Sequence, residues 1–282
     1  MLRFDIAGIL MEVESENRLL FEQMNLFQSR RRSAPDIRIS LHSCERIDKP
    51  QGEVIIEDEV IWVKDSAQDS HYSIFFMNEV SRRTVAKLKV NKDWSNASIT
   101  CIKDSPGGES AIAGLLGSIL VRNRILYHDG FVIHASAVER DNKSILFSAP
   151  SGTGKSTHAR TWEKYGNARV LNDDCPAVRI LENIPIVFGT PWSGSTDKFI
   201  NASAPLSAIV ILEQAPENAI FTLSKSEAFL HLMPRCFLPY FDRDLLNTAI
   251  GHLERVISSV PVYKLKCKPD RAAMELVYQC VR

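Results

Sequence analysis

The chain contains 282 residues, of which 45 % are hydrophobic and 24 % are charged. This apolar content is sufficient for the core of one large domain or of two domains of ordinary size. Lysine plus arginine equals aspartate plus glutamate, at 34 each, so the formal net charge is zero. This balance excludes the strong positive field that draws a protein to nucleic acid or to an anionic membrane.

Six cysteines are scattered along the chain, without a CxxC pair or the spacing of zinc ligands. Such a pattern is typical of reduced thiols in a cytoplasmic protein. Residues 1–8 lack the apolar run of a signal peptide, and no window approaches ~18 uninterrupted apolar residues. We therefore expect a cytoplasmic protein that does not span a membrane.

Residues 1–105 are expected to form a β-rich accessory domain that docks a substrate. β-branched and aromatic residues are concentrated in four segments, which indicates strands at 54–63 (two runs around an acidic turn), 71–76, 84–90 and 97–102. A short helix is expected near 19–27. No catalytic constellation occurs in this part of the sequence.

Turn residues are concentrated at 104–108, and this boundary predicts a catalytic domain at 106–282. A helix is predicted at 109–126, because apolar residues recur there at spacings of three and four. The elements that follow alternate between strands and helices and indicate an α/β (α+β) fold. We predict strands at 131–138, 144–147, 168–171, 176–181, 185–188, 206–213 and 262–266, a turn at 139–143, and helices at 155–165, 226–259 (in large part) and 270–280.

The segment 148–157 reads Ser-Ala-Pro-Ser-Gly-Thr-Gly-Lys-Ser-Thr and lies between a predicted strand and a predicted helix. Small residues let successive backbone N–H groups turn inward around an anion, and the helix N-terminus favours negative charge. Lys155, expected to be an exposed loop charge, would contact phosphates, and the Ser156 hydroxyl would bind Mg²⁺. We therefore assign ATP and Mg²⁺ to this loop, with Ser151, Gly152, Thr153, Gly154, Lys155, Ser156 and Thr157 as nucleotide-binding residues. The alternative is a glycine-rich turn without a ligand.

Asp173 and Asp174 lie at the end of a predicted strand, and Asp173 follows Lys155 by 18 residues. Adjacent side chains at a strand tip point in different directions, so one carboxylate could hold Mg²⁺ while the other accepts a proton. The alternative is an Asx turn that ends the strand. His134, in a predicted apolar strand, is by itself equally consistent with a hydrogen-bonded core histidine.

The order of these motifs resembles that of the HPr serine kinase/phosphorylase family. ATP-dependent phosphoenolpyruvate carboxykinases share the core of that family. The resemblance covers roughly residues 109–282 and is strongest to HPr-kinase-related proteins found beside bacterial peptide-modification genes. The segments that carry it are His-Ala-Ser-Ala-Val from His134, the glycine-rich loop, Asn-Asp-Asp-Cys-Pro from Asn172, Gly-Thr-Pro-Trp-Ser-Gly at 189–194, and 205–213.

The resemblance implies a phosphate loop set in a mixed or mostly antiparallel sheet, and ATP-dependent phosphorylation of a serine in a protein or peptide. It implies catalytic roles for Asp173 (as the base), His134 and Lys155, and Mg²⁺ binding by Ser156 and Asp174. The family's members form hexamers, so a homo-oligomer is an open alternative to a monomer. Other open readings are an ATP-binding regulator, a peptide-binding partner without phosphoryl transfer, a kinase of small hydroxyl compounds, and, less consistent with the chain length, a carboxykinase.

Overall fold

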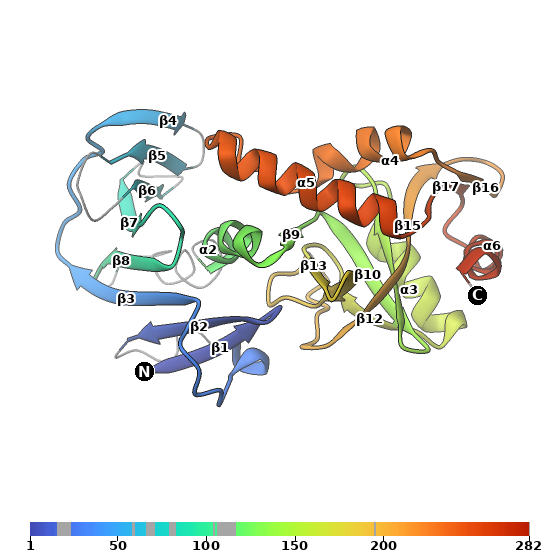
Figure 1. The fold of residues 1–282 in the computed structure, drawn as a ribbon, viewed down its shortest axis with the longest axis horizontal. Helices are drawn as coiled ribbons and strands as arrows, with labels where there is room; N and C mark the ends of the chain where they lie inside the picture. The colour runs from blue at the N-terminus through green and yellow to red at the C-terminus, as the bar shows by residue number, and fades with distance from the viewer. Residues whose placement is uncertain are drawn as a thin grey trace. The chain divides into compact units, whose positions relative to one another are not determined.

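A computed structural model describes residues 1–15, 24–57, 60–65, 71–78, 83–103, 105, 117–194 and 196–281. The chain divides into two compact units, Met1–Tyr127 and His128–Arg282, which are coloured blue to green and green to red in Figure 1. The turn cluster expected at 104–108 and the first half of the helix expected at 109–126 lie largely outside the described residues. The described part of that helix is α2 (Gly117–Arg124), which continues as the 3₁₀ helix η3 (Ile125–His128).

The first unit contains an eight-stranded mixed sheet, in which β3 pairs in parallel with both β2 and β8. Its spatial order is β1-β2-β3-β8-β7-β6-β5-β4. The strands are β1 (Leu2–Ile6), β2 (Ile9–Glu14), β3 (Ile37–Cys44), β4 (Glu53–Glu57), β5 (Val60–Lys64), β6 (Tyr72–Met77), β7 (Thr84–Val90) and β8 (Asn96–Ile102). The strands predicted between residues 54 and 102 are confirmed. Of the helix expected at 19–27, the described residues 24–27 form a single 3₁₀ turn.

The second unit contains a nine-stranded mixed sheet built around the long strand β15 (Ser203–Gln214). β15 pairs in parallel with β11 and β17 and antiparallel with β14. The other strands are β9 (Gly130–Val132), β10 (Ala135–Arg140), β11 (Lys143–Ser148), β12 (Arg169–Asn172), β13 (Ala177–Leu181), β14 (Ile184–Phe188), β16 (Ala219–Thr222) and β17 (Val262–Cys267). The two mixed sheets confirm the predicted α+β class.

Two tight hairpins in this unit follow from turn residues with positive φ. The β10–β11 turn consists of Asp141 (φ 52°) and Asn142 (φ 60°), and the β13–β14 turn consists of Glu182 (φ 50°) and Asn183 (φ 65°). Consecutive left-handed residues form the type I′ turn, whose twist matches that of the two strands. The turn expected at 139–143 is therefore shorter than predicted, because its outer residues extend the ladder.

The single strand predicted at 131–138 is wrong, because the structure divides it into β9 and β10 at Ile133 and His134. β9 pairs with β13, whereas β10 pairs with β11 and β12. At the break, the N–H of Ile133 donates to Pro176 O (3.2 Å) and the N–H of His134 donates to Arg235 O (2.7 Å). The backbone groups thus find partners outside the ladder, and the His134 side chain turns toward the glycine-rich loop.

Four helices cover the two faces of this sheet (Figure 1). α3 (Lys155–Gly166) and α6 (Arg271–Val281) pack together on one face, and α4 (Lys225–Leu232) and α5 (Arg243–Ser259) pack together on the other. The α3–α6 side buries a core that includes Phe147, Trp162 and Met274. The segment expected to be helical at 226–259 is interrupted after the 3₁₀ helix η4 (Met233–Arg235) and resumes at α5, where Asp242 caps the first turn.

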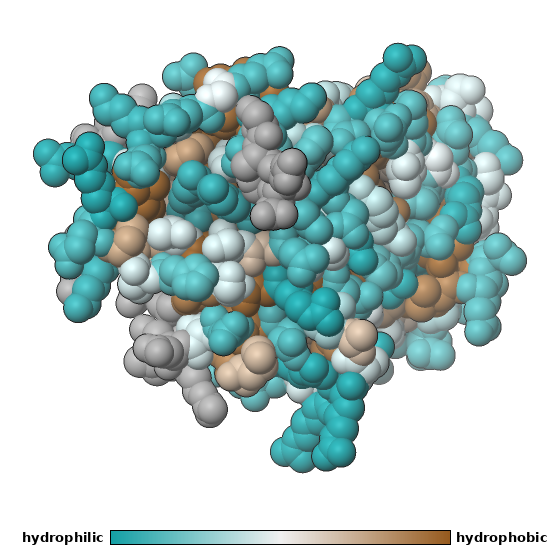
Figure 2. All heavy atoms as spheres, turned by 60° about the vertical axis from the view of Figure 1, so that its left-hand side comes forward, coloured by the Kyte–Doolittle hydropathy of each residue, from teal (hydrophilic) through white to brown (hydrophobic). Residues whose placement is uncertain are grey.

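The surface agrees with the balanced composition. The face drawn in Figure 2 is mostly hydrophilic, and apolar side chains show only in small areas between polar ones. Among the described residues, no helix combines the length and the apolar character needed to cross a bilayer.

Candidate functional site

The glycine-rich loop connects β11 to α3 and forms an open cradle. Gly152 (φ 76°) and Gly154 (φ 105°) adopt conformations that favour glycine, and a Cβ added at either would meet no atom within 4 Å. Gly154 is the N-cap of α3 and provides no side-chain hydrogen bond to the first turn. The first-turn N–H groups are therefore available to an anion, as the chemistry of a phosphate loop requires.

Lys155 is buried, with 6 % of its surface exposed, so the expectation of an exposed loop charge is wrong. Its ammonium donates to Ala149 O (3.2 Å) and lies 2.8 Å from Nε2 of His134. Burial lowers the pKa of Lys155, the negative charge of Asp174 opposes this effect, and the positive charge of Arg235 adds to it. Because burial disfavours the charged form of Lys155, the negative charge of a bound phosphate would stabilise it.

His134 connects Lys155 to Asp174. Because an ammonium group only donates, Nε2 of His134 accepts from Lys155, which leaves the proton on Nδ1. Nδ1 lies 3.0 Å from Asp174 Oδ1, and the Cys175 thiol donates to the other carboxylate oxygen (3.1 Å). The hydrogen bond from His134 lowers the pKa of Asp174 more than burial raises it. Lys155, His134 and Asp174 therefore form one continuous chain of polar contacts beside the loop.

Asp173 points elsewhere, as expected for neighbouring residues at a strand tip. It is 2 % exposed, its Oδ1 accepts from the N–H of Gly194 (2.9 Å), and its Oδ2 accepts from the hydroxyl of Thr196. A Cβ added at Gly194 would lie 3.2 Å from Asp174 Cβ, a contact short enough that a larger residue would have to displace the aspartate by a few tenths of an ångström. The segment 189–194, quoted above for the resemblance, thus packs against the acidic pair.

Asn172 positions both aspartates. Its Oδ1 accepts from the N–H groups of Asp174 (2.9 Å) and Cys175 (2.7 Å), which is the Asx turn anticipated as an alternative. Its Nδ2 donates to Thr190 O (3.0 Å) and Trp192 O (2.9 Å). This fully buried amide therefore ties the end of β12 to the segment that holds Asp173. The Asx turn and the acidic pair occur together, rather than as alternatives.

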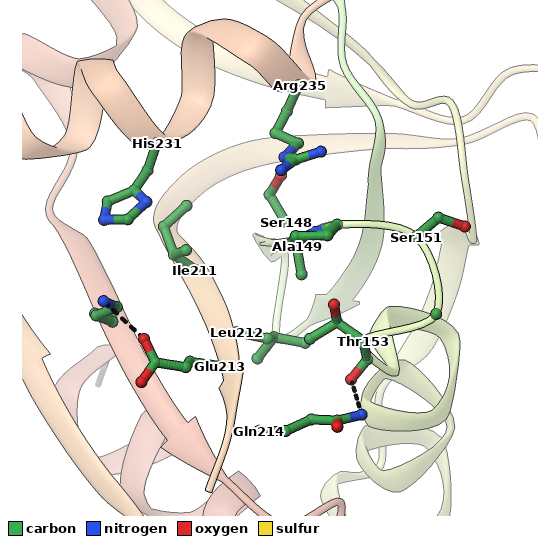
Figure 3. Close-up of a pocket in the computed structure, with 13 residues that line it drawn as sticks. Ser148, Ala149, Ser151, Thr153, Ile211, Leu212, Glu213, Gln214, His231 and Arg235 are labelled. Atoms are coloured by element: carbon green, nitrogen blue, oxygen red, sulfur yellow. Dashed lines mark hydrogen bonds and ion pairs between the residues drawn. The ribbon is translucent and has the colours of Figure 1, made fainter.

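A cavity of about 560 Å³ lies beside the loop, a volume typical of small-ligand sites (Figure 3). One wall is the loop itself, from Ser148 to Thr153, and the other consists of the end of β15, Lys264, and His231 and Arg235 from the α4–η4 segment. The sequence predicted the strand at 206–213 but gave no role to His231, Arg235 and Lys264, since no local pattern marks these three residues.

The other predicted nucleotide-binding residues of the loop differ in their exposure to solvent. Ser151 and Thr157 are exposed, while Thr153 and Ser156 are half-buried. Among the described residues, no three His, Cys, Asp or Glu side chains form a metal cluster. Ser156 and Asp174 carry oxygen atoms, the type of ligand that Mg²⁺ takes, and Mg²⁺ also binds the phosphates of a nucleotide and water. The open cradle and the buried lysine fit an Mg²⁺–nucleotide complex.

Comparisons with known proteins give three findings. A family model described as SynChlorMet cassette protein ScmC matches residues 112–235, which is less than half of the chain. No curated protein matches. Among solved structures, the chain is similar to the Hpr(Ser) kinase/phosphatase from Coxiella burnetii, with 12 % sequence identity, a TM-score of 0.31, and coverage of 53 % of this chain and 93 % of that one. A likeness of this size does not establish a reaction, which must be argued from the site.

Proposed function

We propose that this protein is an ATP- and Mg²⁺-dependent kinase that phosphorylates a serine hydroxyl in a protein or peptide. The observation that carries the proposal is the chain of contacts from Lys155 through His134 to Asp174, beside an open glycine-rich loop and a cavity of about 560 Å³. Bound Mg²⁺–ATP would supply the γ-phosphoryl group.

The chain's own residues have separate tasks in this proposal. The N–H groups of the loop and of the first turn of α3 bind the phosphates, and Lys155 neutralises their charge. His134 and Asp174 fix the position of Lys155, and Ser156 with Asp174 holds the metal ion. Asp173 accepts the proton of the acceptor hydroxyl. The Thr196 hydroxyl supports this role, because it already donates to Asp173 Oδ2 as an acceptor serine would.

The acceptor is proposed to bind to the β-rich unit. This unit ends in two edge strands, β1 and β4, and an exposed edge can pair with an extended peptide through backbone hydrogen bonds. Residues 128–281 contain the loop, the acidic pair and the cavity, so the first unit is available for choosing the acceptor.

A second function, a nucleotide-binding regulator without phosphoryl transfer, is favoured by one observation. Both carboxylate oxygens of Asp173 already accept hydrogen bonds within a buried setting, as in a purely structural residue.

Asp173→Asn distinguishes these functions. An amide keeps the shape of the side chain but does not take a proton at neutral pH, so the kinase proposal expects near-normal affinity for Mg²⁺–ATP and at least a ~100-fold loss of transfer. Calorimetric titration measures affinity, and transfer of labelled γ-phosphate to a serine-containing peptide library or to water measures the reaction. Asp244→Asn, on the exposed first turn of α5, is the matched control. A native chain that binds ATP but transfers phosphate to no acceptor supports the regulator, and an equal loss of affinity and rate would move Asp173 to a metal-binding role.

A further inference from the structure

Arg235 is a half-buried cation with no carboxylate partner in the part of the chain that the structure describes. It is the last residue of η4, and Figure 3 shows its side chain reaching from this turn toward Ser148 and Ala149, where the loop begins. Within the described residues, its guanidinium makes no hydrogen bond and no ion pair. Several other cations of this unit do have carboxylate partners, as in Lys264–Glu213, Lys198–Glu163, Arg255–Asp129 and Arg271–Glu275.

An unpaired guanidinium in a cavity wall indicates an anionic ligand. Removing a charged group from water is unfavourable unless it gains a partner of opposite charge. The positive charges of Arg235 and Lys155 interact, because the charge of Arg235 lowers the pKa of Lys155 further than burial does alone. Two cations that repel each other in the free protein would both be stabilised by a polyanion between them.

The backbone holds Arg235 in place through the break between β9 and β10. Its carbonyl accepts from the N–H of His134 (2.7 Å), and the N–H of Phe237 donates to Val132 O (3.1 Å). Cys236 forms an isolated bridge with Ile133. The same break therefore presents His134 to Lys155 and fixes the turn that carries Arg235. A cation that is positioned before binding loses little conformational entropy when the ligand arrives.

We propose that Arg235 is a second phosphate-binding residue, which contacts the polyphosphate of the nucleotide opposite Lys155. The proposal rests on the proposed function for its ligand, but not on phosphoryl transfer. A guanidinium binds phosphate oxygens through two parallel hydrogen bonds, which an ammonium group does not reproduce.

The test is calorimetric titration of the full chain with two probes, an Mg²⁺-bound non-hydrolysable ATP analogue and inorganic tripolyphosphate. Arg235→Gln should weaken both affinities by about 10- to 100-fold, the range for a hydrogen bond between charged groups. Arg243→Gln removes the same charge from an exposed position of α5 and should leave both affinities unchanged. Thermal unfolding without ligand should be the same for Arg235→Gln and the native chain, because Arg235 has no described partner to lose.

Each outcome decides the proposal. Equal affinities in the native chain and in Arg235→Gln would overturn it, and so would a loss for the ATP analogue but not for tripolyphosphate, which would assign Arg235 to the nucleoside. Arg235→Lys should bind both probes more weakly than the native chain, because an ammonium group does not reproduce the paired hydrogen bonds of a guanidinium, and native affinity in Arg235→Lys would overturn that paired contact. A native chain that binds neither probe would overturn the proposed function itself, and this inference with it.

Discussion

Asn172→Ala is expected to destabilise the second unit more than any ordinary surface substitution. The side chain makes four hydrogen bonds, two as acceptor from the N–H groups of Asp174 and Cys175 and two as donor to Thr190 O and Trp192 O. Each contributes a net 0.5–1.5 kcal/mol, and part of the loss is recovered through water, so we expect a decrease of about 4 kcal/mol in the free energy of unfolding. For a unit of this size, the decrease corresponds to about 10 °C in melting temperature.

Differential scanning calorimetry of the full chain measures this effect and separates the transitions of the two units. Asn247→Ala is the matched control, because Asn247 is exposed on α5 and its loss should change stability by less than about 0.5 kcal/mol. The variant should also bind nucleotide weakly, since Asp174 loses the backbone contact that positions it. A decrease below about 1 kcal/mol for Asn172→Ala would refute the role of this amide as the tie between β12 and residues 190–192.

Two further substitutions test the loop and the core beneath it. Lys155→Met should abolish measurable binding of an Mg²⁺–ATP analogue in a titration, and unchanged affinity would contradict the phosphate-loop assignment. The free energy of unfolding should change little, because the gain from removing a buried charge is offset by the loss of the hydrogen bonds to His134 and Ala149 O. Burial lowers the pKa of His158 from 6.5 to about 4. Above pH 6.5 the imidazole is neutral in both the folded and the unfolded chain, so the protein keeps its full stability there. As the pH falls toward 4, the unfolded chain takes up a proton that the folded chain does not, and the free energy of unfolding decreases by about 3 kcal/mol. His158→Phe should reduce this acid-induced loss in denaturant titrations, and identical pH profiles would contradict it.

Local signals predicted most of the elements of the second unit. The loop, the start of α3 and the two hairpins depend on glycine, asparagine and aspartate residues whose backbone preferences act over a few positions. The division into β9 and β10 could not be predicted in this way. It depends on Pro176 and Arg235, which lie 43 and 102 residues after Ile133 in the sequence, and the apolar residues around the break read as one strand.

The site was predicted in part for the same reason. Gly152, Gly154 and Lys155 belong to one local motif, and the divergence of Asp173 and Asp174 follows from strand geometry. A role for His134 in the site is implied only by the resemblance, since a histidine among apolar residues has no distinctive local signal, and its contact with Lys155 was not predicted. The burial of Lys155 and the placement of Arg235 result from packing between distant segments, and a single arginine in a helical stretch does not reveal them.

The central position of β15 has a consequence for how the unit is synthesised. The edge of β15 that includes Ile209–Leu212 pairs with β17, which begins at Val262, 48 residues after β15 ends at Gln214. During translation this apolar edge emerges before its partner and has no native neighbour until β17 has been made. An exposed strand edge of this kind is prone to pairing between nascent chains. We therefore expect the central sheet of this unit to be completed only once β17 has emerged from the ribosome, and chaperones to protect the edge of β15 until then.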